Sequence, residues 1–124
     1  MILVVDDSKP ILYLLKVILG KKFHVFGATD GFEAMNWLME GNRPDLIISD
    51  LQMPNIDGFE LIAHISSSSY YGDIPVLVLS GTREDDIRKR CGDMHIAGYV
   101  TKPFDPAELI NKVEGALNRK AVAS

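Results

Sequence analysis

Five short apolar runs, separated by stretches with helical periodicity, constrain the fold of this chain more than any other feature. Most of them are rich in β-branched residues and lack polar alternation, which is typical of strands buried on both faces of a parallel sheet. The predicted strands are Ile2–Val5, Phe23–Ala28, Leu46–Ser49, Val76–Leu79 and Gly98–Thr101. Their strict alternation with helices predicts an α/β fold, doubly wound around a five-stranded parallel sheet.

The stretches between and after the strands predict five helices. In the first, Ile11, Leu14, Leu15 and Ile18 recur at i, i+3, i+4 and i+7, after a proline that suits a first helical turn and before Gly20. The other helices are predicted to include Ala34–Met39 with an end at Gly41, Phe59–Ile65, a charged stretch at Arg83–Cys91, and Pro106–Asn118. The tail beyond residue 119 is expected to fray.

Length and composition favour one globular domain, residues 1–124, because 47% of the 124 residues are hydrophobic and suffice for a packed core. The net charge of -4 argues against a sequence-independent nucleic-acid binder, which is normally basic.

The single cysteine, Cys91, excludes a disulfide framework, and no apolar run approaches the ~20 residues of a membrane helix. Met1 leads directly into an apolar run without a basic segment, so we expect no signal peptide and a cytoplasmic location.

Reactive side chains follow four of the five predicted strands. Asp6 and Asp7 follow the first, Asp50 follows the third, Ser80 follows the fourth and Lys102 follows the fifth. Ligands of open α/β sheets bind at the carboxyl ends of the strands, where all of these residues fall. We therefore expect three carboxylates, a hydroxyl and an amine along one edge of the sheet.

A single aspartate after a strand is most often a helix cap or a turn former, and we interpret Asp30 and Asp57 in that way. The adjacent Asp6 and Asp7 are harder to explain, because a cap needs only one of them. With Asp50 nearby, three like charges would destabilise the fold unless a cation is present. A hard divalent ion such as Mg²⁺, which takes few carboxylates together with water and phosphate oxygens, would resolve the repulsion.

These residues belong to a set of short motifs whose order and spacing are specific. The motifs are Val4–Asp7, Ile48–Asp50, Met53-Pro54, Asp57-Gly58, Leu79–Gly81 and Tyr99–Phe104. Together they resemble the receiver domain of bacterial two-component response regulators, of which the chemotaxis regulator is an example, over roughly residues 2–118. The resemblance implies a flavodoxin-like (βα)5 fold with strand order 2-1-3-4-5.

The resemblance also implies a role for each site residue. Asp50 is expected to be the phospho-acceptor and to contact Mg²⁺. Asp7 resembles a direct metal ligand, Asp6 one that acts mainly through metal-bound water, and Gln52 one that binds through its backbone carbonyl.

Three further roles follow from the same resemblance. Ser80 is expected to donate its hydroxyl to a phosphoryl oxygen, and Lys102 to pair with Asp50 and then with the phosphate. The Lys102-Pro103 peptide is expected to be cis, and Tyr99 to be an aromatic rotamer switch.

The implied function is a phosphorylation-dependent switch in a two-component phosphorelay. The donor is expected to be the phosphohistidine of a sensor histidine kinase or a histidine phosphotransfer protein, and the readout a changed surface of the fourth helix, fifth strand and fifth helix. That surface is expected to meet a downstream effector protein or domain, with no direct nucleic-acid or membrane contact. The chain is not expected to be an enzyme beyond its own phosphotransfer and autodephosphorylation.

Three other functions are compatible with parts of this pattern. A Mg²⁺-dependent phosphatase with an aspartyl nucleophile resembles haloacid dehalogenase-like enzymes, but these need an acidic residue where this chain has Gln52. A flavodoxin-like electron carrier needs a phosphate-cradling loop after the first strand, where Asp6 and Asp7 would repel the phosphate. A receiver with a decayed site ranks low, because all of the expected site residues are present.

Overall fold

The computed structural model describes residues 1–51, 58–81 and 96–123. Strands and helices alternate as β1 (Ile2–Val5), α1 (Lys9–Leu19), β2 (Val25–Ala28), α2 (Gly31–Met39), β3 (Leu46–Asp50), α3 (Gly58–Ser67), β4 (Val76–Ser80), β5 (Gly98–Thr101) and α5 (Pro106–Ala123). The charged helix predicted at 83–91 lies outside the described residues. Gln52 and Asp57, in a separate segment, also lie outside them.

All five strands run parallel in the order β2-β1-β3-β4-β5, which confirms the predicted topology. The second strand begins at Val25 instead of the predicted Phe23. The reason is local, because the Phe23 amide donates to the Leu19 carbonyl at 2.9 Å and so belongs to the turn that closes α1. Each strand thus carries only four or five residues.

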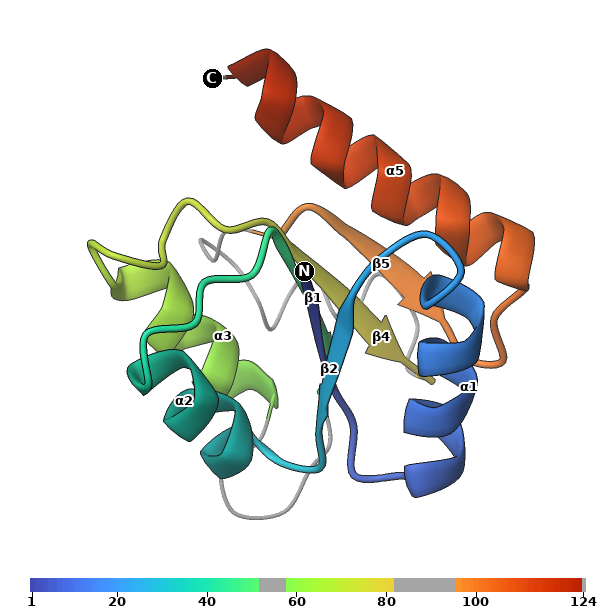
Figure 1. The fold of residues 1–124 in the computed structure, drawn as a ribbon, viewed down its shortest axis with the longest axis horizontal. Helices are drawn as coiled ribbons and strands as arrows, with labels where there is room; N and C mark the ends of the chain where they lie inside the picture. The colour runs from blue at the N-terminus through green and yellow to red at the C-terminus, as the bar shows by residue number, and fades with distance from the viewer. Residues whose placement is uncertain (52–57, 82–95, 124) are drawn as a thin grey trace.

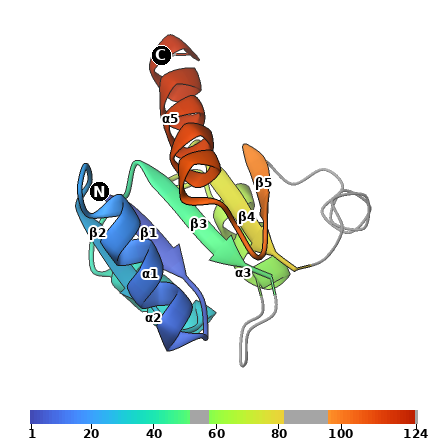
Figure 2. The ribbon, with the colours of Figure 1, turned by 90° about the vertical axis from the view of Figure 1, so that its right-hand side faces the viewer.

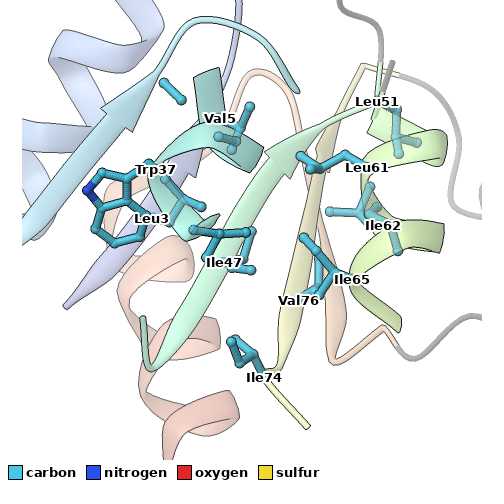
Figure 3. Close-up of a cluster of buried hydrophobic side chains, with 14 residues drawn as sticks. Leu3, Val5, Trp37, Ile47, Leu51, Leu61, Ile62, Ile65, Ile74 and Val76 are labelled. Atoms are coloured by element: carbon cyan, nitrogen blue, oxygen red, sulfur yellow. The ribbon is translucent and has the colours of Figure 1, made fainter. Parts of the chain in front are cut away.

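Successive side chains along the strands point to opposite faces of the sheet, and each face is covered by helices. Figures 1 and 2 show α1 and α5 on one face and α2 and α3 on the other. Leu3, Val5 and Ile47 pack with the second pair of helices, whereas Ile2 and Val4 pack with the first pair. Figure 3 shows the α2 and α3 side of this arrangement, where Leu61, Ile62 and Ile65 meet the strands, among other residues. Burial on both faces explains why the strands read as apolar runs without polar alternation.

The helix ends hold the connections that lead into the sheet edge. Ser8 caps α1 by accepting from the Ile11 amide. Asp30 caps α2 by accepting from the Glu33 amide at 2.8 Å, and this cap was interpreted from the sequence. After α2 the chain turns at Gly41, whose φ of 100° favours glycine. These caps place the first turns of α1 and α2 directly after the carboxyl ends of β1 and β2.

The last helix is longer than predicted. It continues to Ala123, five residues beyond the expected end at Asn118, so the frayed tail expected there is helical up to that residue. No glycine or proline interrupts the chain after Gly115, and the alanines near its end favour helix. Within the described ranges, none of the helices is both long enough and apolar enough to cross a membrane.

Candidate functional site

The strand register brings the predicted site residues to one edge of the sheet. Val5 of β1 lies opposite Ser49 of β3, so Asp6 and Asp50 follow as neighbours. On the other side of β3, the Lys102 amide donates to the Ser80 carbonyl at 2.8 Å, which extends the pairing of β4 and β5. Parallel pairing therefore gathers groups that lie far apart in the sequence.

Three carboxylates cluster at this edge. One oxygen from each of Asp6, Asp7 and Asp50 lies within 4.8 Å of the others. Asp6 is fully buried and Asp50 is 7% exposed, whereas Asp7 is exposed. The cluster therefore has two carboxylates set into the protein and one at its mouth, open to solvent and ligands.

Lys102 contributes the cation nearest to these buried carboxylates within the described part of the chain. Its Nζ lies 2.9 Å from Asp6 Oδ2 and 3.4 Å from Asp50 Oδ2. Burial lowers the pKa of Lys102, but the close carboxylates of Asp6 and Asp50 outweigh burial and raise the pKa above 10.5. The ammonium thus stays protonated and bridges the two carboxylates.

Backbone amides hold the two buried carboxylates in fixed orientations. Asp6 Oδ1 accepts from the Ser8 amide at 2.9 Å, and Asp50 Oδ1 accepts from the Leu51 amide at 2.8 Å. In each case the second oxygen, Oδ2, is the one that faces Lys102. Asp50 therefore presents an oriented carboxylate, which is what a nucleophile or a metal ligand requires.

The residues present fit a divalent metal ion. Asp6 Oδ2 is buried and accepts no well-aligned hydrogen bond, although Lys102 Nζ is close to it. Among the described residues, three carboxylates against one ammonium leave an excess of negative charge that a hard cation would neutralise. All of the donors are oxygens, the ligands that Mg²⁺ prefers. The acidic cluster can therefore hold a metal ion at this edge.

Ser80 and Tyr99 lie on β4 and β5, the two strands that follow β3 in the sheet. Ser80 ends β4 and is 2% exposed. Tyr99 is half-buried in β5, its ring packs against the cluster that α2 and α3 cover, and its carbonyl accepts from Lys112 Nζ. The Lys102-Pro103 peptide is cis, as the resemblance implied.

Two features of this edge were not foreseen from the sequence. Lys102 pairs with Asp50 as expected, but its closer contact with Asp6 was not foreseen. Ser8 fixes Asp6 through its amide and caps α1 through its hydroxyl, a double role that a serine before a proline-containing first turn could have indicated.

Comparison with known proteins gives a consistent picture. Residues 2–114 match the model of the response regulator receiver domain family. The chain is 35% identical to the phosphate regulon transcriptional regulatory protein PhoB of Escherichia coli over 119 residues, covering 95% of this chain and 52% of that protein. It is 29% identical to the hybrid signal transduction histidine kinase D of Dictyostelium discoideum, of which it covers 8%.

Solved structures agree with the fold. The structure of the chemotaxis response regulator CheY4 of Vibrio cholerae superimposes with a TM-score of 0.86 at 30% identity, covering 93% of this chain and 96% of that chain. The chain spans about half the length of PhoB, and the match to this relative therefore concerns one segment of it. The family match over 2–114 and the shared topology together show that this chain belongs to the response regulator receiver domains.

Proposed function

We propose that this receiver domain is a phosphorylation-dependent switch that accepts a phosphoryl group on Asp50 from a phosphohistidine donor. The observation that carries the proposal is the buried Asp50 carboxylate. The Leu51 amide holds one of its oxygens, and the Lys102 ammonium faces the other. In the transfer, an Asp50 oxygen forms a bond to phosphorus while the bond from phosphorus to the donor's imidazole nitrogen breaks. The imidazole leaves with the electron pair and takes up a proton.

Phosphoryl transfer depends on positioning and on neutralising charge more than on covalent help from the protein. Lys102 supplies a fixed positive charge beside Asp50, and the Ser80 hydroxyl at the end of β4 would donate to a phosphoryl oxygen. Asp6, Asp7 and Asp50, with the carbonyl of Gln52, would hold Mg²⁺. Mg²⁺ would supply Lewis-acid neutralisation of the phosphoryl oxygens when bound.

Removal of Asp7 tests the metal site. Mg²⁺ at about a hundredfold excess over its Kd should raise the Tm of the wild type by about 5–10 °C through mass action. Asp7→Ala should lose most of that rise, because it removes the exposed carboxylate of the cluster. Asp45→Ala is the matched control, since Asp45 pairs with the terminal amine of Met1 at the opposite end of β3.

The readouts for this prediction are thermal melts and the fluorescence of Trp37, the single tryptophan. Trp37 packs on Phe26 from α2, so its emission should change little when Mg²⁺ binds at the acidic cluster. If Mg²⁺ raised the Tm of Asp7→Ala as much as that of the wild type, the ion would bind elsewhere. Strong quenching of Trp37 fluorescence by Mg²⁺ would lead to the same conclusion.

The alternative of an aspartyl-nucleophile phosphatase is distinguished by turnover. With acetyl phosphate and Mg²⁺, the switch should accumulate one acid- and alkali-labile phosphoryl group per chain, measured by intact mass. A phosphatase should instead release phosphate from a monoester substrate over many turnovers. Gln52 stands where such enzymes carry an acid, which favours the switch.

A signal requires that phosphate change a surface. A phosphoryl group on Asp50 adds charge and acceptor oxygens, which would draw the Ser80 hydroxyl and its loop inward. We propose that Tyr99, on the neighbouring strand β5, then turns inward and gains burial. The surface of β5 and α5 would change shape and alter contacts with an effector.

The partners proposed are a sensor histidine kinase or a histidine phosphotransfer protein upstream and an effector protein or domain downstream. We place the domain, residues 1–124, in the cytoplasm, where such relays exchange phosphoryl groups. The described strands form one sheet with helices packed on both of its faces, which supports a single folding unit. We assign no enzymatic turnover beyond self-phosphorylation and self-dephosphorylation.

A further inference from the structure

An open groove of about 660 Å³ lies beside α2, on elements that the phosphorylation site does not use. Its aromatic lining comes from Phe26 of β2 and from Phe32 and Trp37 of α2. Phe26 and Trp37 stack with ring centroids 4.8 Å apart and an interplanar angle of 12°. Phe32 is 56% exposed, a large aromatic surface left open to solvent. The groove therefore combines a packed aromatic wall with an exposed aromatic side chain.

The polar lining of the groove is acidic. Asp30, Glu33 and Glu40 contribute carboxylates, and none of the described residues that line it is basic. Glu33 uses Oε2 for both of its bonds to Thr29, and the Glu40 carboxylate accepts no hydrogen bond from the described residues. Carboxylate oxygens thus remain available to a ligand along the rim.

The helix itself adds negative potential at one end of the groove. Glu40 is the C-cap of α2, and the last turn of that helix contains no basic residue. Cations are favoured at a helix C-terminus because the dipole is negative there. An acidic cap without a compensating base is unfavourable within the isolated domain, and a positive charge from outside would relieve it.

Trp37 provides a separate, uncharged indication of a ligand. The residue is 8% exposed, and its indole nitrogen reaches solvent and has no hydrogen-bond partner among the described residues. Figure 3 shows that nitrogen directed away from the buried cluster, and Trp37 lines the groove. A tryptophan with an apolar body and a solvent-accessible N–H suits an interface, because the ring packs while the N–H donates to a ligand. The carbonyl of an extended peptide is a suitable acceptor.

We propose that this groove docks an arginine-containing segment of a partner protein. A guanidinium is planar, stacks on aromatic faces and binds carboxylates through two parallel hydrogen bonds, so it suits an exposed phenylalanine beside glutamates better than an ammonium does. In this assignment Phe32 stacks one guanidinium, which pairs with the adjacent Glu33, and a second arginine of the segment pairs with Glu40, two turns further along α2. The Trp37 N–H donates to the segment's backbone.

The probe is a short capped peptide of alternating glycine and arginine, titrated into the full chain with Mg²⁺ present. Binding should change Trp37 fluorescence saturably and shift its indole N–H signal in NMR spectra. Glu33→Gln combined with Glu40→Gln should weaken binding about fivefold, the effect of losing two exposed charge pairs. Glu108→Gln, which removes an exposed carboxylate on α5, should leave the affinity unchanged.

Two comparisons separate a docking groove from general attraction to an acidic protein. The lysine version of the peptide should bind more weakly, and Phe32→Ala should narrow that difference. The peptide should bind Asp50→Asn as tightly as the wild type, because the acidic cluster is a separate site. Equal loss of affinity in Glu108→Gln, or no saturable change at Trp37, would overturn the proposal. Methylguanidinium binding as tightly as the peptide would also overturn it, since the site would then take a small cation.

Discussion

Asp50→Asn should abolish phosphoryl incorporation from acetyl phosphate and Mg²⁺, because an amide oxygen is not the nucleophile that a carboxylate is. The fold should survive the change. Asparagine can keep the acceptor for the Leu51 amide, and Lys102 keeps its ion pair with Asp6. Intact mass spectrometry measures the adduct, and thermal melts show that the variant is folded.

A matched aspartate shows that the loss is specific. Asp30→Asn keeps the cap of α2, since asparagine caps helices about as well as aspartate, and should be labelled like the wild type. A labelled Asp50→Asn protein, with the phosphoryl group mapped to Ser80 or to a histidine, would contradict the assignment of the acceptor.

Lys102→Met should cost about 2–3 kcal/mol of unfolding free energy at neutral pH without Mg²⁺, because it leaves Asp6 and Asp50 without their cation. Lys22→Met is an instructive control. The Lys22–Glu114 pair has the same 2.9 Å separation as Lys102–Asp6 but is exposed, so its loss should cost less than about 1 kcal/mol. Urea unfolding measures both.

The pH dependence of this difference has a definite sign. The pKa of Lys102 is raised by folding above 10.5, so its stabilising contribution is fully present below 10.5 and is lost as pH rises through the folded value. The difference in unfolding free energy between the wild type and Lys102→Met should therefore stay constant from neutral pH up to 10.5 and disappear above it. Equal effects of Lys102→Met and Lys22→Met would contradict the bridging role.

The fold was readable from the sequence because burial on both faces leaves a strong signal. Residues such as Val4 and Ile48 are fully or almost fully buried, and such positions permit little except apolar, often β-branched, side chains. The edge that holds the site could also be predicted, because the carboxyl ends of parallel strands lie at the same edge of a sheet. Boundaries were harder, since the Phe23 amide belongs to a turn although its side chain is as apolar as a strand residue.

Distances between side chains could not be read in the same way. That Lys102 lies closer to Asp6 than to Asp50 depends on where β1, β3 and β5 end relative to one another in space. The groove beside α2 was also missed. It arises from the stacking of Phe26 on Trp37 across two elements, whereas in sequence these residues look like ordinary core positions.

The central claim, that phosphate at Asp50 is transmitted to the surface of β5, is tested most directly by fluorine NMR of fluorotyrosine-labelled protein with and without beryllofluoride and Mg²⁺. Of the four tyrosines, Tyr99 alone lies on β5, and Tyr99→Phe identifies its signal. We expect the Tyr99 signal to move on binding of this phosphoryl mimic, the Tyr13 signal on α1 to stay, and neither to move in Asp50→Asn. A Tyr99 signal that keeps its position and linewidth in the wild type, while the bound beryllofluoride resonance is present, would contradict the coupled switch.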